Sequence, residues 1–138
     1  MSADHFLDTN ILVYAFEKEI PKKRDIALSL IKPDSPWAIS WQVIQEFSTV
    51  GLHKFKVPLK PEFLDLFLEE VLWPHCQAFP NPALYKKAIQ LHVETQYRFY
   101  DCLILAAALE SGVGILYSED LQHGRSFGHL RIVNPFLD

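Results

Sequence analysis

The heptapeptide Phe6-Leu7-Asp8-Thr9-Asn10-Ile11-Leu12 places a carboxylate between two apolar runs near the start of the chain. Apolar surroundings normally select against charge, so an acid at such a position is either paired or functional. The residues before Asp8 are typical of a short buried strand, and the apolar residues after it recur at helical spacing. The heptapeptide therefore predicts a strand over 5–7, an acid at its carboxyl end, and a helix that begins at Asn10.

Three further acids occupy comparable positions: Glu46 in Gln45-Glu46-Phe47, Asp101 in Tyr100-Asp101-Cys102-Leu103-Ile104, and Asp120 in Tyr117-Ser118-Glu119-Asp120. Glu46 lies beside the apolar face of a predicted helix that Ser40 caps. Asp101 stands at the head of a predicted helix over 102–110, and Asp120 follows a predicted strand over 115–117. In each case a charged side chain adjoins an element that is otherwise apolar.

Strand and helix patterns alternate along the whole chain. Strands are expected at 5–7, 37–39, 76–79, 115–117 and 130–133, and helices begin near 10, 21, 40, 61, 81 and 102. Such alternation requires crossover connections, which produce a parallel sheet covered by helices on both faces. Ligands of such sheets bind beyond the carboxyl ends of the strands, so we expect the four acids to converge there.

The predicted helix over 61–73 is apolar around most of its circumference. That is more apolar surface than one core contact requires, which favours burial on two sides. Together with the regions around Trp41 and Phe55, this helix is therefore a candidate contact surface for another protein chain.

Length and composition indicate one domain over 1–138, since 138 residues that are 49% hydrophobic suffice for a single core. Residues 1–5 lack the pattern of a signal peptide, and no apolar run approaches the roughly 20 residues of a membrane span. A cytoplasmic protein without membrane contact is expected. Cys76 and Cys102 form no recognisable motif and are interpreted as reduced thiols.

The balance of charge supports a clustered acidic site. Thirteen Lys plus Arg face seventeen Asp plus Glu, for a net charge of −4, so setting the four acids aside leaves thirteen of each sign. This balance argues against a broad basic groove for nucleic acid. It does not exclude a polyanionic substrate, because divalent cations would neutralise the acidic cluster.

Several carboxylates in one cleft repel each other unless some are protonated or a cation is present. Oxygen ligands alone suit Mg²⁺ or Mn²⁺, whereas a zinc site would show Cys or His at coordinating spacing. Such ions activate water and hold a phosphodiester, so the pattern favours metal-dependent phosphodiester hydrolysis. Thr9, Asn10 and Ser118 add neutral groups suited to orienting the acids.

The four motifs, in this order and spacing and over nearly the whole chain, resemble those of the PIN-domain nucleases. Within that family the chain looks most like the VapC-type toxins of bacterial and archaeal toxin–antitoxin pairs. The resemblance implies a three-layer α/β/α fold with a central parallel sheet, a Mg²⁺- or Mn²⁺-dependent endoribonuclease, a homodimer, and inhibition by a small antitoxin.

The resemblance also assigns residues. The metal-binding and catalytic acids would be Asp8, Glu46, Asp101 and Asp120, supported by Asn10 and Ser118. Glu119 adjoins the last acid and would either replace or assist it.

Other interpretations stay open at this point. Asp8 and Asp101 could serve only as helix caps, Glu46 as a solvated helix residue, and Glu119-Asp120 as an ordinary turn. An aspartyl-phosphate phosphatase would also place an acid after the first strand, but it requires a second acid where Asn10 stands. A PIN nuclease for RNA processing or DNA, without an antitoxin, and a non-catalytic binding module are the remaining alternatives.

Overall fold

The computed structural model describes residues 3–137, in which one mixed sheet of six strands has the order β3-β2-β1-β4-β6-β5. The strands are β1 (His5–Leu7), β2 (Trp37–Ser40), β3 (Cys76–Ala78), β4 (Ile115–Tyr117), β5 (Ser126–Phe127) and β6 (Leu130–Val133). Every neighbouring pair is parallel except β5 and β6. The prediction of an α/β fold with a central parallel sheet is confirmed for five strands. It missed antiparallel β5, whose two residues are too few to show any periodicity.

The helices agree closely with the predicted ones. They are α1 (Thr9–Tyr14), α2 (Pro21–Leu30), α3 (Trp41–His53), α4 (Pro61–Phe67), the π-helical η1 (Leu68–Leu72), α5 (Trp73–His75), α6 (Pro82–Thr95) and α7 (Phe99–Glu110). The predicted cap is present, since Ser40 Oγ accepts from the Val43 N–H at 3.3 Å; where a helix was expected to begin near 81, Asn81 Oδ1 accepts from the Leu84 N–H at 2.9 Å. These side chains fix where α3 and α6 begin.

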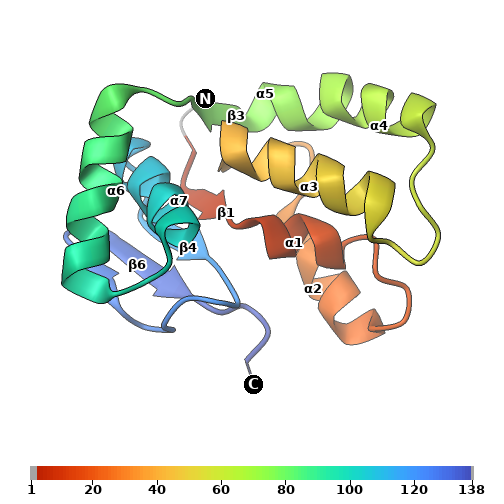
Figure 1. Ribbon diagram of the computed structural model, residues 1–138. Helices are drawn as coiled ribbons and strands as arrows, with labels where there is room; N and C mark the ends of the chain where they lie inside the picture. The colour runs from red at the N-terminus through yellow and green to blue at the C-terminus, as the bar shows by residue number, and fades with distance from the viewer. Residues whose placement is uncertain (1–2, 138) are drawn as a thin grey trace.

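Two layers of helices cover the sheet. The chain moves in one direction from β1 to β2 to β3 and then returns across the sheet to β4. Right-handed crossovers therefore place α1 to α5 on one face and α6 and α7 on the other. Figure 1 shows α6 and α7 grouped on one side of the molecule and α1 to α4 on the other. Residues Cys102 to Ala108 of α7 are all buried, which makes this helix the centre of its layer.

The apolar helix predicted over 61–73 is present but irregular, since it passes from α4 through η1 into α5. Pro74 has no N–H to continue the ordinary ladder, which accounts for the π-helical turn before it. Much of its apolar surface is covered by this same chain: the half-buried Phe67 ring lies 5.4 Å from that of Phe16 and 5.6 Å from that of Phe47. Leu66 and Trp73 remain exposed. No helix of residues 3–137 has both the length and the apolar character to cross a membrane.

Candidate active site

The candidate site lies at the switch point of the sheet, between β1 and β4, where the order in which the chain adds strands changes direction. Strands β1 and β4 are adjacent and parallel, but one continues to β2 and the other to β6. Helix α1, which follows β1, and helix α7, which precedes β4, lie on opposite faces of the sheet, and ligands of such sheets bind in the crevice at the carboxyl ends of the two strands. Asp8 directly follows β1 and Ser118 directly follows β4, so both flank this crevice.

Asp8 is the most deeply buried acid of the site, with an exposed fraction of 5%. It caps α1: its Oδ1 accepts from the Thr9 N–H at 2.7 Å, and its Oδ2 accepts from the Ser118 hydroxyl at 2.8 Å. Burial raises the pKa of Asp8 to about 7, against the lowering effect of these two hydrogen bonds, and the carboxylates of Asp101 and Asp120 add to the rise. Asp8 therefore caps α1, but its burial disfavours the charged form of its carboxyl group.

Glu46 and Asp120 lie at the same crevice, where side chains of α1 hold both of them by hydrogen bonds. The Thr9 hydroxyl donates to Glu46 Oε1, and the Asn10 amide donates to Asp120 Oδ2 at 2.7 Å. The other oxygen of Glu46 accepts from the Gln42 amide at 3.3 Å, one turn earlier on α3. The first turn of α1 therefore orients an acid from α3 and an acid that follows β4.

Asp101 lies in the first turn of α7, not at its head, because the helix begins at Phe99, three residues earlier than predicted. Burial raises the pKa of Asp101, Arg98 lowers it, and Asp120 and Glu46 raise it again. The Arg98 Nε lies 3.6 Å from Asp101 Oδ2, but its side chain is 86% exposed, so this contact is a weak surface pair. The helix dipole also favours an acid at this position.

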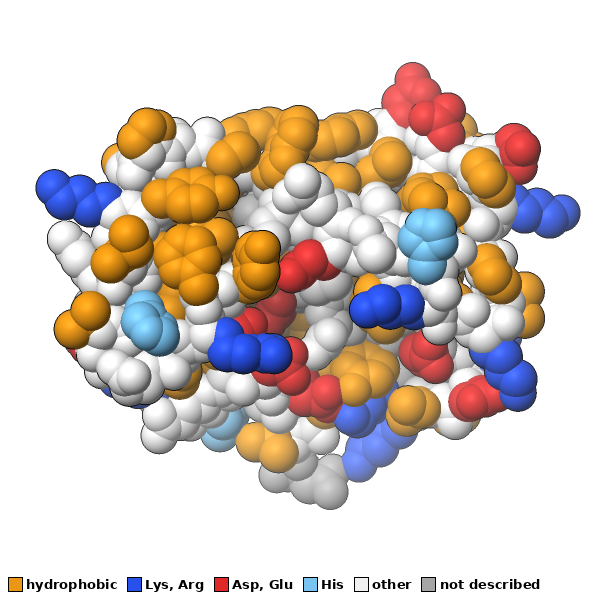
Figure 2. Space-filling model, in the orientation of Figure 1, with side chains coloured by type: hydrophobic (Ala, Val, Ile, Leu, Met, Phe, Trp, Pro, Cys, Tyr) orange, Lys and Arg blue, Asp and Glu red, His pale blue; other side chains and the backbone are white. Residues whose placement is uncertain are grey.

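All four acids line one open cleft of about 630 Å³. Figure 2 shows acidic side chains gathered in the hollow at the middle of one face, with basic side chains at its rim. Arg98 and Lys54 are the two basic residues that line the cleft. The convergence expected from the sequence is thus present, and it joins segments that are separated by more than 100 residues.

Glu119 belongs to a different set of contacts. It accepts hydrogen bonds from the Tyr14 hydroxyl at 2.5 Å and from the Lys23 ammonium, and it does not line the cleft. Burial raises its pKa, but the hydrogen bonds from Lys23 and Tyr14 outweigh this effect and hold the pKa below its usual value. Of the two neighbouring acids, only Asp120 faces the other carboxylates.

The donor set fits a hard divalent cation, since it consists of carboxylate, hydroxyl and amide oxygens. Burial raises the pKa values of Asp8 and Asp101, and the neighbouring carboxylates raise them further, so a bound cation would favour the charged forms of both acids. Within residues 3–137, however, no three Asp, Glu, His or Cys side chains are close enough to hold an ion as they stand. Glu46 and Asp120 are turned toward Thr9 and Asn10, so ligation would require these side chains to reorient.

Sequence reasoning missed two polar residues of the cleft. Gln42 donates both to Glu46 and to the Tyr100 carbonyl oxygen at 3.0 Å, which ties α3 to the start of α7. Lys54 follows α3 and supplies positive charge near the acids. The sequence did carry a signal for Gln42, because it lies four residues before Glu46 on one predicted helix. Nothing in the sequence pattern marks Lys54.

These features define an α/β protein with an acidic ligand cleft at the switch point of its sheet. A family model described as the PIN domain matches residues 5–125. The chain therefore belongs to the PIN-domain family, which is a family of nucleases. A search of curated protein sequences finds no significant match.

Solved structures share the fold over nearly the whole chain. A toxin–antitoxin complex from Klebsiella pneumoniae is similar with a TM-score of 0.65 and 21% identity, over 97% of this chain and 98% of that chain. VapBC2 from Rickettsia felis, bound to a DNA fragment from its promoter, has a TM-score of 0.60 and 23% identity, over 93% and 96% of the two chains. The sarcin-ricin loop cleaving toxin VapC20 of Mycobacterium tuberculosis has a TM-score of 0.60 and 15% identity, over 84% and 89%.

Proposed function

We propose that this chain is a Mg²⁺- or Mn²⁺-dependent endoribonuclease that acts as the toxin of a toxin–antitoxin pair. The observation that carries this proposal is the cleft in which Asp8, Glu46, Asp101 and Asp120 meet at the switch point. The similar structures add support, because two are toxin–antitoxin complexes and a third is a toxin that cleaves the sarcin-ricin loop.

In this proposal the four acids hold the cation, with Asp8 and Asp101 as its principal ligands. A bound divalent ion would activate a water molecule and stabilise charge on the leaving oxygen. The protein's own part is orientation: Ser118 and the Thr9 N–H fix the two oxygens of Asp8, and Asn10 holds Asp120. Arg98 and Lys54 at the rim would attract the phosphates that flank the bond to be cleaved.

Cleavage assays test the chemistry. The purified protein should cleave labelled single-stranded RNA with Mg²⁺ or Mn²⁺, leave the matching DNA intact, and be inactive in chelator. Asp8→Asn and Asp101→Asn should each reduce cleavage on the order of 100-fold or more, because an amide is a poor substitute for a metal-binding carboxylate. Glu119→Gln is the matched control outside the cleft. Cleavage by Asp8→Asn at the rate of the unaltered protein would refute the assignment.

The partners follow from the same proposal. We propose a homodimer that acts in the cytoplasm and is inhibited by a small antitoxin, encoded by a short gene next to that of this chain. Expression of this chain alone should arrest growth, and co-expression of the neighbouring gene should restore it. Growth arrest that Asp8→Asn does not relieve would show that toxicity has another cause.

A further inference from the structure

A second, smaller cavity adjoins the acidic cleft. It has a volume of about 190 Å³ and shares Gln42, Gln45 and Tyr100 with the lining of the cleft. We call it the aromatic cavity, and we propose that it binds an unpaired nucleobase next to the phosphodiester in the acidic cleft. This inference rests on the proposed nuclease function and specifies the form of its substrate.

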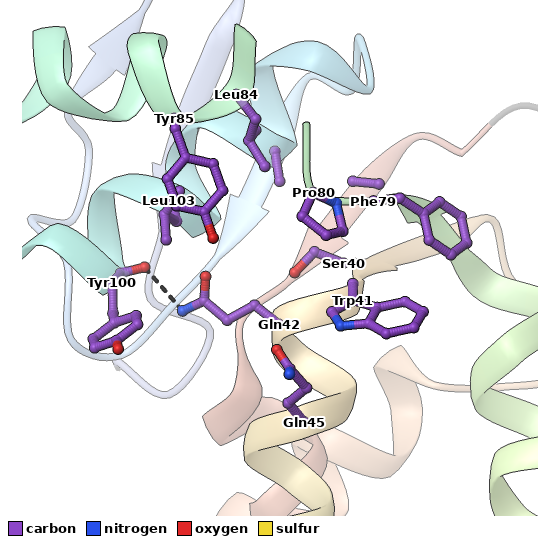
Figure 3. A pocket seen from close by; sticks show the side chains of 12 residues that line it. Ser40, Trp41, Gln42, Gln45, Phe79, Pro80, Leu84, Tyr85, Tyr100 and Leu103 are labelled. Atoms are coloured by element: carbon purple, nitrogen blue, oxygen red, sulfur yellow. Dashed lines mark hydrogen bonds between the residues drawn. The ribbon is translucent and has the colours of Figure 1, made fainter. Parts of the chain in front are cut away.

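The walls of the cavity are aromatic rings from separate elements. Figure 3 shows Tyr85 of α6 and Tyr100 of α7 on one side and Trp41 of α3 and Phe79 on the other. All four side chains are exposed, with Tyr100 at 68%. Trp41 packs beside Phe79 at 5.8 Å between ring centroids, and on the other side the Phe99 ring lies 6.0 Å from that of Tyr85 and 6.4 Å from that of Tyr100, so each wall contacts a neighbouring ring. Exposed aromatic faces of this kind stack nucleobases in proteins that bind single strands.

Polar groups without protein partners lie between these walls. The Gln42 amide nitrogen is engaged by Tyr100 and Glu46, which fixes the side chain and leaves its Oε1 toward the cavity (Figure 3). Within residues 3–137 three polar groups at the cavity make no hydrogen bond with the protein: Gln42 Oε1, the Gln45 side-chain amide and the Tyr85 hydroxyl. Amide groups read the Watson–Crick edge of a base that is splayed out of its strand.

Position and size favour a base over a segment of protein. Tyr100 and Asp101 are consecutive, as are Gln45 and Glu46, so the cavity begins one residue from two of the candidate metal ligands. A strand whose phosphate lies among the acids therefore brings the next nucleotide to the cavity. A base held there cannot be paired, so the substrate must be single-stranded or a loop.

Fluorescence of 2-aminopurine tests this proposal separately from cleavage. The Asp8→Asn protein, which should bind without cleaving, is titrated in Mg²⁺ with single-stranded RNA hexamers that carry 2-aminopurine at one position in turn. We expect quenching at one position or two adjacent positions. Adding Tyr85→Ala should abolish the quenching and weaken binding on the order of 5- to 150-fold. Adding Gln45→Ala should keep the quenching but reduce the preference among bases.

Phe63→Ala is the control, since Phe63 is an exposed aromatic residue of α4 outside the cavity. Quenching that is uniform, absent, or unchanged by Tyr85→Ala would overturn the proposal. A lower mass of the Tyr85→Ala protein in light scattering, with unchanged RNA binding, would overturn it too and identify the cavity as a contact between copies of the chain. Cleavage by the unaltered protein without quenching rejects the base site alone, whereas localised quenching without cleavage supports the base site and rejects the nuclease.

Discussion

Replacing Asp8 by asparagine should stabilise the metal-free protein at neutral pH while it abolishes cleavage. The Asp8 carboxyl has a pKa of about 7 in the fold, against 3.8 in an unstructured chain. Three units of pKa correspond to about 4 kcal/mol of folding free energy. Because the folded pKa is raised, the folded chain binds more protons, so this free energy is fully available below pH 3.8 and is lost as pH rises through 7.

The asparagine variant does not titrate, so the difference between the two proteins should change with pH. From pH 5 to pH 8 the free energy of unfolding of the unaltered protein should fall relative to that of Asp8→Asn by about 2.5 kcal/mol. At pH 5 Asp8 is protonated in the fold, so the neutral asparagine resembles it and the two proteins should differ in stability by less than about 1 kcal/mol. By pH 8 the variant should be the more stable protein.

Urea unfolding in chelator at pH 5, 6, 7 and 8 measures this difference. Asp34→Asn is the matched control, because Asp34 is exposed and does not line the cleft. The quantity compared is the difference in free energy of unfolding between Asp8→Asn and the unaltered protein. If this difference is the same at every pH, or favours the unaltered protein more as pH rises, then the pKa of Asp8 is not raised in the fold.

Three other predictions concern the metal site, Glu119 and the exposed side of α4. Addition of Mn²⁺ at ten times its dissociation constant should stabilise the unaltered protein by about 1.4 kcal/mol in urea unfolding and Asp8→Asn much less; equal stabilisation of both would place the ion elsewhere. Glu119→Gln should cost about 1 kcal/mol at pH 7 but little at pH 3, because the lowered pKa of Glu119 contributes stability that is lost as pH falls, and it should leave the response to Mn²⁺ intact. Leu66→Asp, on the exposed side of α4, should halve the mass in light scattering if α4 joins two chains, and an unchanged dimer would exclude that surface.

The sequence predicted the elements of this fold well where the physical signal is local. A capping side chain such as Ser40 or Asn81 marks its helix directly, and the apolar runs before Asp8 and after Gly114 mark two central strands. Strand β5 could not be predicted, because its pairing with β6 depends on the turn at Gly128, whose φ of +59° only tertiary context reveals.

The same division applies to the site. Motif order was sufficient to predict that four acids converge, and their role as metal ligands stays a prediction. The hydrogen bonds that orient them were not accessible from the sequence, because the contacts of Thr9 with Glu46 and of Asn10 with Asp120 join residues 37 and 110 positions apart. Sequence periodicity does not relate residues so far apart, and only the folded sheet brings them into contact.

Glu119 and Asp120 show why adjacent acids can differ in their suitability as ligands. Glu119 is matched by a full positive charge from Lys23, so a cation that recruited it would first have to break an ion pair. Among residues 3–137 the Asp120 side chain is held only by the neutral amide of Asn10, and its charge helps to raise the pKa values of Asp8 and Asp101. A cation at the cleft would therefore gain the attraction of Asp120 by displacing a neutral amide, not a positive charge. The side chain of Lys23, not the position of either acid along the chain, separates the structural carboxylate from the candidate ligand.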